Sequence, residues 1–322
     1  MRRSFNVFDI PPDVTPSVIR TDSEALHVIW SDDNHVSQYP WKFIYHYLQH
    51  DHRKSEFINL KYWGSEIAEN PPAVNFDSVM STTSQGGMGE LMSKIREYGF
   101  AFVEGTPDGD HEGTRRLLER VVSLTATHYT KPYEFITDLS LADPTCINQA
   151  QPAHTDTTYF AEPVGLQAFH VLSNSPSPPG TAASSEADGD TLLVDGFRAA
   201  KLLYSEDPVA YTLLHQVRLP WYASNRSGYA IAPDQGYPVL EVDERTGDHH
   251  SIFRVRWNNA ERGVVPFDDG ISPAKWYEAA RKWDAMLKRK DVEYRMKLVP
   301  GRVLCKSSQT LYCQLIKPGS LG

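Results

Sequence analysis

Short apolar runs broken by polar turns mark the first part of the chain, from Ser17 to about Asp51, and this pattern is typical of a small β unit. The polar stretch 31–34 predicts a turn within the unit. The aromatic and aliphatic run Trp41 to Leu48 predicts a short helix that closes it. Because Pro and Gly punctuation follows, we place a boundary near residue 70, between an N-terminal β-rich domain over 1–70 and a larger domain over 71–322.

Helical periodicity appears twice after that boundary. Leu91 and Ile95 fall on one face of a predicted helix that ends at Gly99. A second helix is indicated by the apolar spacing of residues 117–124. Between the two helices, the run 100–103 predicts a short buried strand.

The pattern changes to strands after residue 154. Strand-length apolar or alternating segments cover residues 165–172, 190–195 and 252–257, and the Ser-, Pro-, Ala- and Gly-rich stretch 173–188 predicts a mobile surface loop. One late helix begins at Ser272 as N-cap and places four apolar residues on one face: Trp276, Ala280, Trp283 and Leu287. We therefore predict a mainly β fold with flanking helices, specifically a double-stranded β-helix, or jelly roll.

Composition excludes several functions. Lys and Arg are outnumbered by Asp and Glu, 32 to 41, and the formal net charge is −9, so we expect no nucleic-acid partner. No apolar run reaches the length of a membrane span, so we expect no membrane partner. The three cysteines are too scattered for a disulfide framework, which favours a reducing compartment. We expect a cytoplasmic protein and leave a mitochondrial one open.

The clearest chemical motif is His154-Thr155-Asp156. On a strand edge, residues one apart point to the same side of the pleat, so the imidazole and the carboxylate would converge. Such a pair forms two-thirds of the 2-His-1-carboxylate triad that binds Fe(II) and leaves positions open for a co-substrate and O₂. The alternative is a turn-capping Asp beside a surface His.

Around that motif the chain resembles the trimethyllysine and gamma-butyrobetaine dioxygenases, a family of Fe(II)- and 2-oxoglutarate-dependent oxygenases. The resemblance is carried by residues 154–160, 162–167, 189–197 and 257–263 and runs from about residue 8 to Leu304. It implies hydroxylation of N6-trimethyllysine in carnitine biosynthesis, with gamma-butyrobetaine as a rival substrate. It also implies Fe(II), 2-oxoglutarate, O₂ and ascorbate as cofactors and co-substrates, and a homodimer.

The same resemblance assigns residues to the two small molecules. Thr191 is the candidate 2-oxoglutarate residue, with Asn258 or Asn259 lining the same pocket, although Thr191 is equally expected as an ordinary β-branched strand residue. A quaternary ammonium donates no hydrogen bonds, so aromatic faces must recognise it. The substrate candidates are Tyr129, Tyr133, Asp143 and Tyr159. For Phe135 and Phe160 a core position is favoured, and Cys146 stands where the family has a third cage tyrosine.

The family pattern breaks after Leu304. There the family continues into an Asp-Asn-Trp-Arg-x-Leu-His-Gly-Arg block, which supplies the distal iron histidine, and then an arginine that pairs with 2-oxoglutarate. Here the sequence Cys305-Lys306-Ser307-Ser308 follows, and no histidine occurs after His250 in the 322 residues. We therefore expect incomplete C-terminal strands and keep a catalytically inactive form as the second hypothesis. The cysteines of the family's N-terminal zinc site are also absent, with only His35 as an orphan ligand.

Overall fold

The computed structural model describes residues 7–31, 35–48, 60–109, 111–121, 152–172, 190–224, 230–242, 251–267, 272–307 and 311–315. The chain divides into two compact units, Met1–Ile58 and Asn59–Gly322. This boundary, after Ile58, lies about a dozen residues before the boundary near residue 70 that the sequence predicted. Among the helices of the described residues, none is long and apolar enough to cross a membrane.

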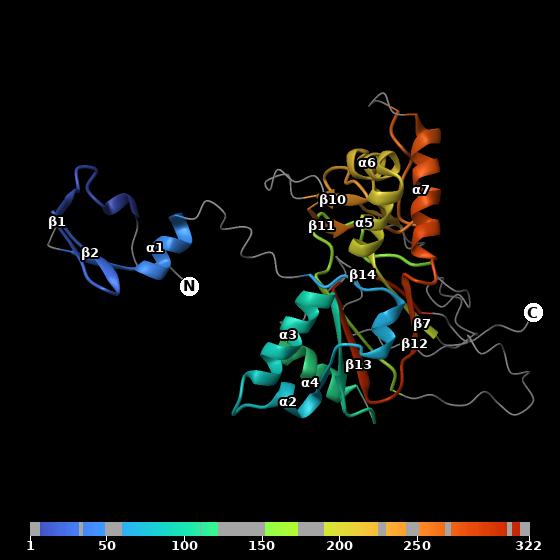
Figure 1. Ribbon diagram of the computed structural model, residues 1–322, viewed down its shortest axis with the longest axis horizontal. Helices are drawn as coiled ribbons and strands as arrows, with labels where there is room; N and C mark the ends of the chain where they lie inside the picture. Colours follow the sequence, from blue (N-terminus) through green and yellow to red (C-terminus); the bar gives the residue numbers. More distant parts are fainter. Residues whose placement is uncertain are drawn as a thin grey trace, which may run out of the picture. The chain divides into compact units, whose positions relative to one another are not determined.

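The N-terminal unit is a three-stranded antiparallel sheet followed by a helix (Figure 1). After the 3-10 helix Val7–Asp9 its elements are β1 (Pro16–Thr21), β2 (Ala25–Trp30), β3 (Val36–Pro40) and α1 (Trp41–Leu48). The central strand β2 buries Ala25 and Val28, and the indole of Trp30 donates to Ser37 Oγ on β3. The predicted β unit and its closing helix are confirmed.

The larger unit is built on two sheets. The four-stranded sheet has the order β4-β5-β13-β6, with β4 parallel to β5 and the other pairs antiparallel. Its strands are β4 (Ala73–Asn75), β5 (Phe100–Glu104), β13 (Arg302–Ser307) and β6 (Leu166–His170). The three-stranded antiparallel sheet has the order β12-β7-β14, with β12 at Glu293–Lys297, β7 at Asp190–Asp195 and β14 at Leu311–Leu315.

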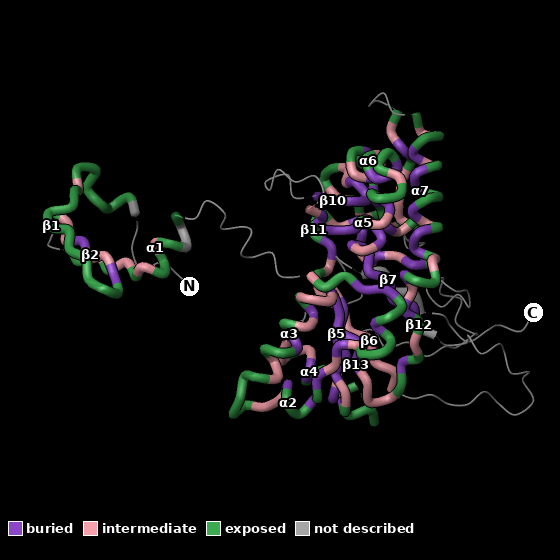
Figure 2. Tube along the Cα trace, viewed as in Figure 1, coloured by how far each residue is buried: buried purple, intermediate pink, exposed green. Residues whose placement is uncertain are grey.

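A buried aromatic core joins these two sheets. Residues from both belong to one cluster: Phe100, Phe102 and Leu304 from the four-stranded sheet, Leu193 and Tyr294 from the three-stranded one, and Trp63 from the segment before η2 (Ser65–Glu69). Figure 2 shows β5 and β7, which contribute to this core, as buried. Because side chains alternate along a strand, Thr191 lies on the same face of β7 as Leu193.

Helices cover the outer faces of the two sheets. On β5 and β13, Ala101, Val103 and Cys305 belong to a cluster shared with α2 (Phe76–Met80), α3 (Gly86–Tyr98) and α4 (Glu112–Val121). On β7, Leu192 and Val194 belong to a cluster shared with α5 (Gly196–Glu206), α6 (Pro208–Gln216) and α7 (Pro273–Leu287). The order of layers is therefore helices, sheet, sheet, helices (Figure 1).

Two further strand pairs complete the described elements. β10 (Leu240–Val242) pairs with β11 (Ile252–Val255), and β8 (Ala223–Ser224) pairs with β9 (Ala230–Ile231), both antiparallel. β10 and β11 contribute Leu240, Val242, Ile252 and Val255 to the cluster of α5, α6 and α7.

The fold is mixed α/β, so the expectation of a mainly β protein is correct only in part. The sequence missed α5 and α6, although each begins at an aspartate N-cap. Asp195 accepts from the backbone N–H of Phe197 and Arg198, and Asp207 accepts from that of Ala210, with Pro208 in the first turn. After Leu304, residues 305–307 complete β13 and residues 311–315 form β14, which pairs with β7.

Asp195 gives a test of this packing. Its Oδ1 accepts from the N–H of Phe197 (2.9 Å) and Arg198 (3.1 Å), and its Oδ2 accepts from the N–H of Trp63 (3.1 Å). We expect Asp195→Ala to cost about 2–3 kcal/mol, because three donors lose their acceptor, and to lower Tm by roughly 5 °C. Asp284→Ala, at a half-buried position of α7 where the carboxylate pairs with Lys288, is the control. Equal melting temperatures for both variants in a thermal scan would contradict this assignment.

Candidate active site

The His154 motif lies in an irregular loop before β6, so its predicted position on a strand edge is wrong. The loop is fastened to the segment after β11: the N–H of Thr155 donates to Trp257 O (2.7 Å), and the N–H of Trp257 donates to Thr155 Oγ1 (2.8 Å). Both Thr155 and Trp257 are buried. These bonds fix the backbone between the two candidate ligands.

The two candidate ligands nevertheless converge. His154 Nε2 lies 3.2 Å from Asp156 Oδ1, and His154 Nδ1 lies 2.9 Å from the carbonyl oxygen of Pro152. A carbonyl only accepts, so Nδ1 carries a hydrogen and Nε2 is the atom turned toward Asp156. Such an orienting bond on the far nitrogen is the usual support of a metal-binding histidine.

A buried lysine completes this cluster. Lys306, on β13, is fully buried, and its Nζ lies 3.7 Å from Asp156 Oδ2 and 2.7 Å from Gln167 Oε1 on β6. Burial raises the pKa of Asp156, but hydrogen bonds from His154 and Gln167 and the charge of Lys306 outweigh it and lower that pKa. Burial lowers the pKa of His154, and its bonds to Asp156 and Pro152 raise it overall. No motif or spacing in the sequence singles out Lys306.

An iron site of the 2-His-1-carboxylate type needs three protein ligands. His154 and Asp156 fit two of the three positions. Within the described ranges, no group of three or more His, Cys, Asp or Glu residues could hold a metal ion. The described residues therefore do not make a complete triad, and a lysine ammonium stands beside one of the two ligands that they supply.

Arg256 fixes the other half of the loop. Its guanidinium is fully buried and donates to Glu241 Oε1 (3.0 Å). It also donates to three backbone carbonyls of the loop, those of Thr158, Phe160 (2.7 Å) and Ala161 (3.2 Å). The ring of Tyr237 lies 4.2 Å from the guanidinium carbon. Arg256 thus holds the backbone that follows Asp156. The available signal was the pair Arg254 and Arg256 within the largely apolar segment 252–257.

Two other features show that the backbone after Asp156 is held in place. Thr157 has a φ of 56°, a left-handed conformation that a β-branched residue adopts only when its surroundings enforce it. Its Oγ1 accepts from the N–H of Val164 (3.0 Å). Next to it, the hydroxyl of Thr158 donates to Glu261, whose pKa is raised by burial. Strain directly after Asp156 is typical of a functional loop.

The candidate co-substrate residues are spread over two places. Thr191 is buried on β7, on the face that looks toward the inter-sheet core. Asn258 and Asn259 follow Trp257, and their side chains already serve the local turn. Asn258 Oδ1 accepts from the N–H of Ala260 (3.1 Å), and Asn259 Oδ1 accepts from Arg262 Nε (2.8 Å). Asn259 is exposed.

Of the candidate substrate residues, one is described. Tyr159 is buried and packs edge-on against Phe160, with ring centroids 4.9 Å apart. Tyr129, Tyr133 and Asp143 lie outside the described residues, as do Phe135 and Cys146. The ammonium cage therefore stays a prediction.

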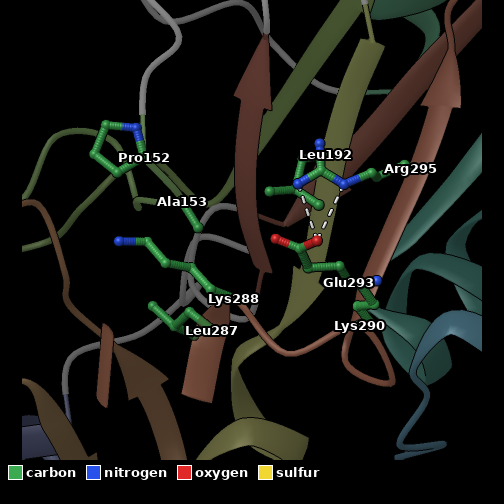
Figure 3. Close-up of a pocket in the computed structure, with 8 residues that line it drawn as sticks. All are labelled: Pro152, Ala153, Leu192, Leu287, Lys288, Lys290, Glu293 and Arg295. Atoms are coloured by element: carbon green, nitrogen blue, oxygen red, sulfur yellow. Dashed lines mark hydrogen bonds and ion pairs between the residues drawn. The ribbon is translucent and has the colours of Figure 1, made fainter. Parts of the chain in front are cut away.

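A cavity of about 740 Å³ opens beside Pro152 and Ala153, directly before His154 (Figure 3). It is also lined by Leu192, Leu287, Lys288, Lys290, Glu293 and Arg295, and Glu293 and Arg295 form an ion pair across 2.9 Å. Leu192 and Thr191 point to opposite faces of β7. The cavity thus lies on the helix-covered face of the sheet, whereas Thr191 faces the other sheet.

Two facing sheets beside a His-x-Asp loop fit a metal-dependent oxygenase, and sequence comparison assigns the class. Residues 57–305 match the taurine catabolism dioxygenase TauD, TfdA family, and the chain belongs to this family of Fe(II)- and 2-oxoglutarate-dependent dioxygenases. It is 47% identical to the trimethyllysine dioxygenase of Neurospora crassa, over 94% of this chain and 68% of that protein. It is 32% identical to the human mitochondrial trimethyllysine dioxygenase, over 94% and 69% of the two chains.

Two weaker similarities complete the comparison. Identity to human gamma-butyrobetaine dioxygenase is 20%, over 88% of this chain and 70% of that one. Among solved structures, the PvcB protein of Pseudomonas aeruginosa superposes with a TM-score of 0.50 at 17% identity, covering 71% of this chain and 74% of that one. The latter supports the fold alone.

Proposed function

We propose that this chain carries the site for hydroxylation of N6-trimethyllysine to 3-hydroxy-N6-trimethyllysine, a step of carnitine biosynthesis. The observation that carries the proposal is the convergence of His154 and Asp156 at 3.2 Å beside the two facing sheets. The identity of 47% to a trimethyllysine dioxygenase over 94% of the chain supports the choice of substrate. In this reading the two sheets are the halves of a double-stranded β-helix.

The residues divide the work by chemistry. His154 and Asp156 would hold Fe(II), which when bound supplies the activation of O₂. Thr191, with Asn258 or Asn259, would position 2-oxoglutarate, and ascorbate would keep the metal reduced. The aromatic faces of Tyr129, Tyr133 and Tyr159, with the carboxylate of Asp143, would select the trimethylammonium group. We further propose a homodimer, in the cytoplasm or, like the human relative, in mitochondria.

A second candidate is a form with little or no catalytic activity. Two observations favour it: the family match ends at Cys305, and the next residue, Lys306, places its ammonium 3.7 Å from Asp156. Residues 305–322 contain neither histidine nor arginine. In this reading the residues up to Leu304 keep the family's site, and the segment after Leu304 lowers its activity.

Substrate choice tests the proposed function. The residues after Leu304 are replaced by the corresponding segment of the Neurospora crassa relative, and products are identified by mass spectrometry. We expect hydroxylation of N6-trimethyllysine, about tenfold or more slower reaction of gamma-butyrobetaine, and none of unmethylated lysine, which lacks the quaternary ammonium. Faster reaction of gamma-butyrobetaine would overturn the substrate assignment. His154→Ala is the control for the metal site.

A further inference from the structure

Lys306 reaches the space between the two sheets. It lies on β13, opposite Phe100 of β5 and Gln167 of β6. Along β13, Cys305 packs toward the helices and Leu304 belongs to the inter-sheet core. Side chains alternate along a strand, so Lys306 points the same way as Leu304, into the interior.

In this position the charge of the Lys306 ammonium is balanced by nearby groups. It donates to Gln167 Oε1 at 2.7 Å, lies 3.7 Å from Asp156 Oδ2, and stands 5.6 Å from the ring centroid of Phe169. A fully buried cation is stable only when it has a counter-charge and hydrogen-bond partners. Asp156 is the carboxylate that supplies this counter-charge.

Both oxygens of Asp156 are thus engaged by positive or proton-bearing groups. Oδ1 faces His154 Nε2 and Oδ2 faces Lys306 Nζ. A divalent cation at the same carboxylate would stand within a few ångströms of the ammonium, in an interior where charges are weakly screened. The two cations would repel each other, and they would share one counter-charge.

We propose that Lys306 is a resident counter-cation of Asp156 that competes with a divalent metal ion for this site. The inference rests on the proposed function in taking His154 and Asp156 as the metal ligands. It makes Lys306 a positioning residue in the metal-free protein. It also predicts that one particular side chain, Lys306, lowers the affinity of His154 and Asp156 for a metal ion.

The test measures metal affinity in the 322-residue chain without any substrate. Mn(II), a redox-stable substitute for Fe(II), is titrated by calorimetry and by the EPR signal of free Mn(II). We expect Lys306→Met to bind Mn(II) about tenfold or more tightly than the unaltered chain, because the competing charge is gone while the side-chain length is kept. Lys306→Arg keeps the charge and should bind no more tightly. Lys297→Met, at an exposed position of β12, is the matched surface control.

A second readout concerns the metal-free protein. Lys306→Met leaves Asp156 without its cation, so its Tm without metal should fall and should rise further on addition of Mn(II) than that of the unaltered chain. Lys306→Gln keeps a hydrogen-bonding group and serves if Lys306→Met does not fold. Unchanged Mn(II) affinity in the folded variant, or equal tightening by Lys306→Arg, would overturn the proposal. So would weaker 2-oxoglutarate binding in Lys306→Met with Mn(II) affinity unchanged, which would make Lys306 a carboxylate anchor.

One further variant separates this inference from the proposed function. His154→Ala, combined with Lys306→Met, should abolish the gain in Mn(II) affinity. If the gain persists without His154, the metal is bound elsewhere and the assignment of the site fails. If His154→Ala weakens Mn(II) binding but Lys306→Met changes nothing, the metal site stands and the competition fails.

Discussion

Replacing Arg256 with methionine is expected to lower the free energy of unfolding by about 3–5 kcal/mol, the usual cost of removing one partner of a buried ion pair. The change would leave Glu241, itself buried, without the donor at 3.0 Å. It would also leave the carbonyls of Thr158, Phe160 and Ala161 without theirs. Methionine keeps most of the side-chain volume, so the loss would come from charge and hydrogen bonding.

Thermal unfolding checks this result. A loss of that size corresponds to a fall in Tm of roughly 10 °C for a unit of this length. Arg218→Met is the control, because Arg218 is exposed at its guanidinium and makes one long bond, 3.3 Å, to the carbonyl of Gly236. A fall of less than about 2 °C for Arg256→Met would show that the neighbouring Arg254, which lies 3.4 Å from Glu241, can replace it.

Local sequence signals predicted the elements whose ends carry special residues. Gly99 ends α3 with a φ of 77°, a conformation that favours glycine. The late helix begins after Ser272, at Pro273, and buries Trp276 and Trp283 as its periodicity required. Here local propensity and tertiary packing agree, so the sequence alone was sufficient.

Other elements depended on packing that the sequence does not display. α5 and α6 lie against the outer face of β7. Their buried apolar residues belong to a cluster that they share with α7 and β7. The mixed α/β character therefore emerged only in three dimensions. The strand-like pattern around His154 was misleading for a similar reason, because the loop is shaped by bonds to Trp257 and Arg256, which are about a hundred residues away in the sequence.

In the candidate site too, some residues are evident from a local motif and others only from the tertiary structure. His154 and Asp156 were found from a short motif. Their convergence in the folded loop also depends on the bonds between Thr155, which lies between them, and Trp257. Lys306 approaches them only because β13 lies beside β6, which brings it next to Gln167 across a sequence separation of 139 residues. Neither spacing nor composition carries that information. The segment after Leu304 consequently read as a departure from the family pattern, with no indication that it enters the site.

The largest expected effect is on turnover. The described residues offer two candidate ligands, with the Lys306 ammonium 3.7 Å from one of them. In the family that the chain resembles, the segment after Leu304 supplies a distal histidine and an arginine for 2-oxoglutarate. A metal site needs its full ligand set held in place to leave the reactive positions open. We therefore expect the chain with a relative's segment after Leu304 to form hydroxytrimethyllysine about a hundredfold or more faster than the unaltered chain.

The most direct measurement of the central claim is hydroxytrimethyllysine formation and succinate release by these two proteins, side by side, with Fe(II), 2-oxoglutarate and ascorbate. We expect product from the chain with the relative's segment, loss of that product on His154→Ala, and little or none from the unaltered 322-residue chain. Equal turnover by both chains, or turnover that survives His154→Ala, would contradict it.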